Sequence, residues 1–159
     1  MTGRSELVGR LRAERDAFQT LCGLLEREQR CLIQADAEAL LEITRLKSEE
    51  VDRLSALAQH RVDKLFSAGL ATDQAGMNAW LARQPDSERV ELDAVWQELT
   101  GFAMQARALN ETNGKLISAR LSHNQAALAA LEVSNRSLDV YGPDGQASIS
   151  AGQRELGKA

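Results

Sequence analysis

The sequence has few of the residues that interrupt helices or mark special sites. Its 159 residues include only two prolines, two cysteines and six aromatic residues. Basic residues are outnumbered, with 19 Lys and Arg against 23 Asp and Glu, which gives a net charge of −4. This balance argues against nucleic-acid binding, because such proteins need a cationic surface. No apolar run approaches the roughly 20 residues that cross a bilayer, and the first residues lack the apolar core of a signal peptide. We therefore expect a soluble cytoplasmic protein.

Leucine and alanine are the residues that the sequence has in abundance. The chain contains 23 leucines and 24 alanines, and both types lose little conformational freedom in a helix. The composition therefore predicts an all-α protein.

Cys22 and Cys31 are nine residues apart in one expected helix, about 13 Å along its axis. That distance is too long for a disulfide, so we expect two reduced thiols.

The two prolines divide the chain. Pro85 and Pro143 each stand beside turn-forming residues, and proline interrupts helices. Between them the apolar residues recur with helical spacing almost throughout. We expect a single helical domain over residues 1–141 and a flexible tail over residues 142–159, where Gly, Ser, Ala and Gln show no apolar periodicity. The expected helices cover about 5–34, 36–66, 74–83 and 86–138.

The first two expected helices form an antiparallel hairpin. One apolar stripe, interrupted at Glu14 and Glu28, comprises Leu7, Leu11, Phe18, Leu21, Leu25 and Leu32. A second stripe, out of phase with the first, comprises Leu40, Ile43, Lys47, Leu54, Leu57 and Leu65. Asp36 lies between them and is a good helix N-cap, so the pattern predicts two helices of about 45 Å joined near Ala35. One continuous helix through Asp36 is the alternative.

A short connector helix is expected next. Asp73 is placed to cap it, and Met77, Trp80 and Leu81 would form its buried face. Packing of Trp80 onto the hairpin is favoured over a role as a binding anchor, because this spacing is typical of a core face.

The longest expected helix follows Pro85. Its stripe, spaced mostly by four and three residues, comprises Leu92, Trp96, Leu99, Ala103, Ala106, Asn110, Asn113, Ile117, Leu121, Asn124, Leu128, Leu131, Asn135 and Leu138. At about 80 Å this helix is longer than the hairpin, so its last 20 to 25 residues are expected to extend beyond the hairpin with their stripe exposed.

The distal part of this helix has an unusual composition. Only four of the thirty residues from Phe102 to Leu131 are charged. The outer face of the helix carries Ala, Ser, Thr, Asn and Gln, and removing water from these residues against a partner costs little free energy. Asparagine in an apolar stripe selects register and partner. The pattern predicts a surface for another helix, and it is equally compatible with self-association into a homodimer or with packing back inside the monomer.

Nothing in the sequence indicates catalysis or a cofactor. His60 and His123 lie in separate expected helices, and no metal-ligand, nucleophile or phosphate-binding motif is present. We therefore expect no enzyme activity, no metal site and no cofactor.

Gly114 lies within a helical pattern, where glycine costs about 1 kcal/mol of helix stability relative to alanine. A kink or a close helix crossing would explain it.

Two motifs resemble those of the FlgN family of flagellar export chaperones. They are Leu109–Ile117, which reads LNETNGKLI, and Leu138–Gln146, which reads LDVYGPDGQ. The leucine-rich rhythm of Leu21–Glu28 also resembles this family, and so do the positions of Asp36, Lys47, Arg61, Met77, Trp80 and Leu81. The similarity extends from about Leu7 to Gln146.

The resemblance implies a specific function. Members of this family are cytoplasmic chaperones that bind the terminal helical segment of unassembled hook-associated proteins and deliver them to the cytoplasmic domain of the flagellar type III export gate. On this basis the client-binding residues would be Asn110, Asn113, Gly114, Ile117, Leu121, Asn124, Leu128 and Leu131. Tyr141 would dock into an apolar depression of the export gate, or alternatively fold back onto Trp96 or Phe102. A structural coiled-coil homo-oligomer and a helical adaptor for a non-flagellar partner remain the alternatives.

Overall fold

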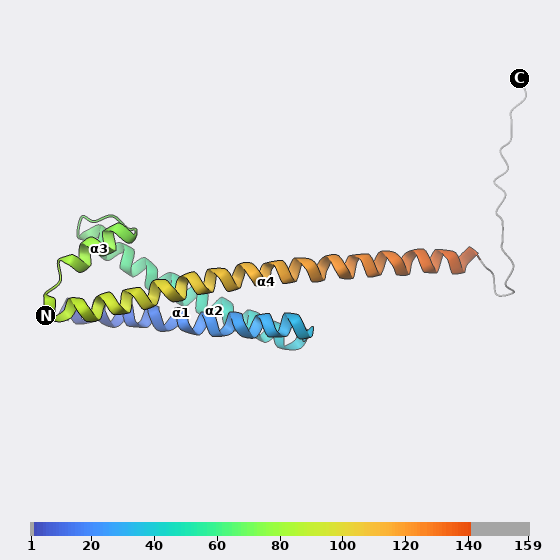
Figure 1. Cartoon of the computed structure of the whole chain (residues 1–159), viewed down its shortest axis with the longest axis horizontal. Coiled ribbons are helices and arrows are strands. Elements are labelled where there is room, and N and C mark those ends of the chain that lie inside the picture. Colours follow the sequence, from blue (N-terminus) through green and yellow to red (C-terminus); the bar gives the residue numbers. More distant parts are fainter. Residues whose placement is uncertain (1, 141–159) are drawn as a thin grey trace, which may run out of the picture. The chain divides into compact units, whose positions relative to one another are not determined.

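The structure, a computed structural model, describes the backbone of residues 2–140 and the side chains of residues 6–136. It contains helices α1 (Thr2–Gln34), α2 (Ala37–Ser67), α3 (Gln74–Ala82) and α4 (Asp86–Val140) (Figure 1). The described residues include no strand, and the predicted all-α fold is confirmed. The largest differences from the expected bounds are at the start of α1, which is Thr2 rather than residue 5, and at the end of α4, which is Val140 rather than residue 138.

The chain divides into two compact units. The first comprises the residues up to Ile117, and the second begins at Ser118. The first unit therefore contains α1, α2, α3 and the beginning of α4. The described part of the second unit is the remainder of α4.

The turn between α1 and α2 is tight and is closed from both sides. Ala35 has a positive φ of 58°, and the backbone N–H of Asp36 donates to the carbonyl of Cys31 at 3.0 Å. This is the Schellman pattern that ends many helices, although glycine usually occupies the position of Ala35. The side chain of Asp36 then accepts from the N–H of Ala39 at 3.0 Å and caps α2. The predicted break at Asp36 is confirmed.

The connector folds as the sequence predicts. Gly69, with φ of 69°, ends α2, and the Asp73 side chain accepts from the N–H of Gly76 at 3.0 Å to begin α3. Met77 is buried, and Trp80 is partly buried against the core. A side chain at Gly76 would meet the carbonyl oxygen of Ala71, so the loop before α3 depends on this glycine.

The ion pairs define the directions of the long helices in the first unit. Glu14 pairs with Arg61 and Glu28 with Lys47, so α1 and α2 are antiparallel. Arg15 pairs with Glu98, and Glu28 accepts a hydrogen bond from Asn113. Both partners follow the same order along α1 and α4, so α1 and the beginning of α4 are parallel. Figure 1 shows the hairpin and α3 beside the end of α2.

Two apolar clusters form the core of this unit. The first joins all four helices through Leu11, Leu65, Met77, Leu81, Leu92, Val95, Trp96 and Leu99. The second joins α1, α2 and α4 through Ala17, Leu21, Cys22, Leu25, Leu54 and Ala106. The stripes predicted from the sequence supply most of these residues. Both cysteines are free thiols, as predicted, and Cys22 is buried in the second cluster.

Candidate functional site

The exposed leucines of α4 are the strongest candidate for a binding surface. Within the second unit every described side chain, over residues 118–136, is exposed. Leu121 is 56% exposed, and Leu128 and Leu131 are each 61% exposed. Burying one such side chain is worth roughly 1.5–3 kcal/mol, and a row of exposed large apolar side chains is typical of an interaction site.

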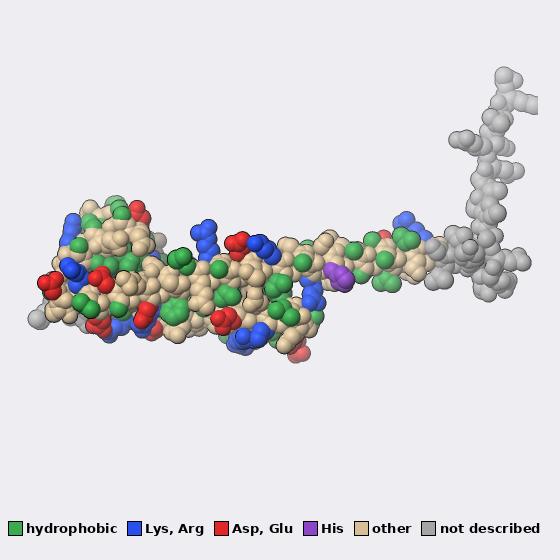
Figure 2. Space-filling view, viewed as in Figure 1, with side chains coloured by type: hydrophobic (Ala, Val, Ile, Leu, Met, Phe, Trp, Pro, Cys, Tyr) green, Lys and Arg blue, Asp and Glu red, His purple; other side chains and the backbone are tan. Residues whose placement is uncertain are grey.

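These leucines lie on one face of the helix and have few charged neighbours. Leu121, Asn124, Leu128 and Leu131 follow one another at intervals of three, four and three residues, with Asn124 also exposed. That spacing is the seam of a coiled coil. Only three of the 19 residues from 118 to 136 are charged, and Figure 2 shows correspondingly few coloured charges on this part of α4. The face could be desolvated against a second helix at little electrostatic cost.

Three more of the predicted residues are exposed within the first unit. Ile117 is 47% exposed, and Asn110 and Gly114 are also at the surface. A side chain at Gly114 would meet no described atom within 4 Å, so the close helix crossing considered for this glycine is not present in the unit. The space beside Gly114 is open to a partner.

Asn113 is buried, unlike the other proposed client-binding residues. The family resemblance assigned it to the client-binding set, but it is only 1% exposed. Its Nδ2 atom donates to Oε2 of Glu28 at 2.8 Å and to the backbone carbonyl of Leu25 at 2.9 Å. Both contacts are made to α1, so Asn113 holds α4 against α1 inside the bundle and does not belong to an exposed binding face.

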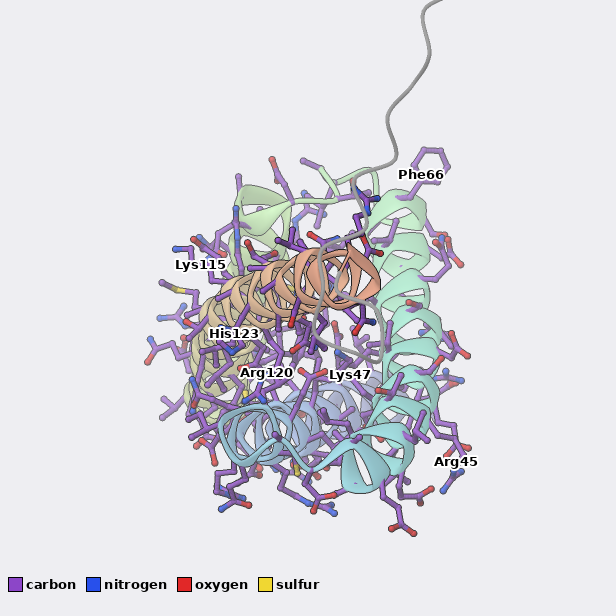
Figure 3. All side chains as sticks on the ribbon, turned by 90° about the vertical axis from the view of Figure 1, so that its right-hand side faces the viewer. Arg45, Lys47, Phe66, Lys115, Arg120 and His123 are labelled. Atoms are coloured by element: carbon purple, nitrogen blue, oxygen red, sulfur yellow. The ribbon has the colours of Figure 1, made fainter. Side chains whose placement is uncertain are left out.

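Asn113 is one part of a buried polar cluster that joins three helices. The side chain of Glu28 in α1 is 5% exposed, and its Oε1 atom accepts from Nζ of Lys47 in α2 at 2.7 Å. Figure 3 shows Lys47 on the inner side of α2, whereas Arg45 points away from the bundle. Because each carboxylate oxygen of Glu28 has a donor, its burial is compensated.

A second polar cluster repeats the arrangement toward the other end of the hairpin. Glu14 is 1% exposed, and it accepts from Nε and Nη2 of Arg61 at 3.1 Å. The guanidinium of Arg61 lies over the ring of Trp96 in α4, 5.2 Å from its centroid. Each cluster therefore combines an α1 glutamate, an α2 cation and an α4 side chain.

The sequence contained the signals for both clusters. Glu14 and Glu28 interrupt the apolar stripe of α1, and Lys47 occupies a position in the stripe of α2. Arg61 lies outside the predicted stripes, and only its family-like position singled it out. A charged residue within an apolar stripe indicates a buried pair, but the sequence does not say which charges meet.

Tyr141, the predicted docking residue, and the predicted flexible tail of residues 142–159 lie outside the described residues. Over the described part of the chain, no three His, Cys, Asp or Glu residues are grouped so that they could hold a metal ion. None of the described helices is both long and apolar enough to cross a membrane.

Comparisons with known proteins agree with the motifs. A family model described as FlgN protein matches residues 1–149. The Flagella synthesis protein FlgN of Proteus mirabilis is 29% identical over 153 residues, which cover 94% of this chain and 96% of the relative. No solved structure matches the chain significantly.

Proposed function

The chain belongs to the FlgN family, a family of flagellar proteins, and from this we propose that it is a cytoplasmic chaperone for flagellar export. In this proposal it binds unassembled hook-associated proteins, prevents their premature association, and delivers them to the export gate of the flagellar type III secretion system. The client-binding surface is the exposed face of the second unit that comprises Leu121, Asn124, Leu128 and Leu131, and Ile117 of the first unit is a further proposed client-binding residue.

One observation carries the proposal: large apolar side chains are exposed at coiled-coil spacing in a segment with few charges. A helix of this kind is suited to bind the terminal helical segment of a client, because the client supplies the missing apolar side of the seam. Asn124 would favour the correct register, since an amide in the seam is satisfied only when it meets a polar partner. Asn110 and Gly114 stay proposed client-binding residues within the first unit, whereas the buried Asn113 does not.

The proposal is tested by placing charges on the face. In the double variant Leu121→Asp/Leu128→Asp, each carboxylate would have to be desolvated on binding, so we expect binding to a co-expressed hook-associated protein to fall at least a hundredfold. The protein should stay folded, because these side chains bury little surface in the free chain. Val90→Asp/Met104→Asp is the matched control, since Val90 and Met104 are 77% and 74% exposed on the same helix.

The outcomes separate the proposal from its alternatives. Equal binding by the double variant and the control would place the client elsewhere. A wild-type chain that dimerises at micromolar concentration, and loses the dimer with the two leucines, would instead favour the structural homo-oligomer. A truncation after Ile117 is the corresponding deletion. Truncation after Ala106 is unsuitable, because it would also remove Asn113 from the bundle.

A further inference from the structure

A groove in the first unit is bounded by the faces of three helices. It has a volume of about 310 Å³, roughly twice that of a cavity that holds a benzene ring. Phe18, Leu21 and Leu25 line it from α1 at intervals of three and four residues, so they share one face of that helix. The groove has room for one large apolar side chain and part of its neighbours.

The walls come from α2 and α4. Val51 of α2 is 44% exposed and lines the groove opposite Ala103 and Ala106 of α4. Alanines leave space where a larger residue would close the groove. A hollow between two helices above an apolar floor is the shape that receives the apolar side chains of an amphipathic helix.

The polar lining of the groove has one sign of charge. Lys47, Arg107 and Asn110 line it, and no Asp or Glu does. The ion pair with Glu28, at 2.7 Å, fixes the position of Lys47. Glu28 is buried and also accepts a hydrogen bond from Asn113. The cation on this side of the groove is therefore held in place before any partner arrives.

Arg107 differs from Lys47 because it has no ion-pair partner among the described residues. It is exposed on α4, and a guanidinium can bind both oxygens of a carboxylate at once. An apolar floor beside an unpaired arginine complements a segment that carries an apolar side chain and a nearby acid. It would repel a basic segment.

We propose that this groove binds an acidic amphipathic helix of a partner protein. One leucine- or phenylalanine-sized side chain of that helix enters the space above Phe18 and Leu25, and a carboxylate one turn away pairs with Arg107. The site consists only of residues of the first unit. It contains none of the exposed leucines of the proposed function, and Asn110 is the one lining residue that also belongs to the proposed client-binding set.

The test uses two fluorescein-labelled, alanine-based helical peptides and the full-length protein. Both peptides carry one central leucine, and four residues later one has glutamate and the other lysine. Fluorescence anisotropy should show at least tenfold tighter binding of the glutamate peptide to the wild-type chain. Arg107→Glu should reverse the preference, and Arg107→Gln should remove it without reversing charge.

Further variants separate this groove from other surfaces. Val51→Glu should weaken the glutamate peptide at least tenfold, whereas Val90→Glu, a matched change outside the groove, should leave binding unchanged. Leu121→Asp/Leu128→Asp should bind the peptide normally even where it loses a hook-associated client. No saturable binding of the glutamate peptide, equal binding of both peptides, or an equal loss in Val90→Glu would each overturn the inference.

Discussion

Nδ2 of Asn113 in α4 lies 2.8 Å from Oε2 of Glu28 in α1, and the other oxygen of that carboxylate lies 2.7 Å from Nζ of Lys47 in α2. One buried glutamate thus connects the three long helices of the first unit. The same Asn113 amide also donates to the carbonyl of Leu25. These contacts fix where along α1 the beginning of α4 packs.

Replacing Asn113 with alanine should destabilise the bundle. The change removes a donor from a buried carboxylate and opens a small cavity, so we expect the free energy of unfolding to fall by about 1–3 kcal/mol. Urea titration followed by circular dichroism measures this. Asn110→Ala, on the exposed side of α4, should change stability by no more than about 0.5 kcal/mol. Similar values for the two variants would contradict a structural role for Asn113.

The Glu14–Arg61 pair should be costly to break from one side. Arg61→Met leaves the carboxylate of Glu14 buried without its cation, and we expect a loss of about 3–5 kcal/mol. Glu14→Leu/Arg61→Met should recover most of that loss, because no charge remains in the core. Arg45→Met, in an exposed ion pair with Glu42, should cost less than about 1 kcal/mol. Thermal unfolding of the four proteins tests this order.

The turn at Ala35 can be improved. Because its positive φ of 58° is unfavourable for a residue with a Cβ, Ala35→Gly should raise the free energy of unfolding by up to about 1 kcal/mol. The matched variant Ala37→Gly, at the first helical residue of α2, lacks this benefit and should not stabilise the protein. A destabilised Ala35→Gly variant would show that the turn differs from the one described.

The two cysteines should differ in reactivity. Burial raises the pKa of the Cys22 thiol, and the nearby charge of Glu26 raises it further. Since the thiolate is the reactive form, Cys22 should be alkylated by iodoacetamide much more slowly than Cys31 at pH 8. Unfolding in urea removes both causes, and the two rates should then converge. Mass spectrometry resolves the two sites, and faster labelling of Cys22 in the folded protein would contradict its burial.

Tyr141 should act in delivery and not in client binding. It is the only aromatic residue after Phe102, and the family resemblance assigns it to the export gate. Tyr141→Ala should leave client affinity unchanged and weaken binding to the soluble domain of the gate at least about tenfold, because a docked ring buries on the order of 150 Å². Tyr141→Phe should retain most of that binding. Loss of client binding in Tyr141→Ala would instead assign the residue to the client surface.

The local features of the fold could be read directly from the sequence. The spacing of apolar residues predicted all four helices, Asp36 and Asp73 marked two helix starts, and Pro85 marked the beginning of α4. Each of these signals acts within one or two helical turns, where side chain and backbone interact directly. The exposed positions of Leu121, Leu128 and Leu131 also follow from the sequence, since that stretch has an apolar stripe and almost no charges.

The tertiary structure decided which residues meet. Asn110 and Asn113 both fit the same stripe, but only Asn113 is buried, because it alone faces the carboxylate of Glu28 across the helix pair. Likewise, the sequence shows Lys47 inside an apolar pattern without identifying its partner. Burial of a polar group depends on a matching group from a distant segment, and no local pattern specifies which one arrives. The composition thus determined the helices and the exposed face, whereas the packing of three helices determined the buried polar clusters and the groove beside them.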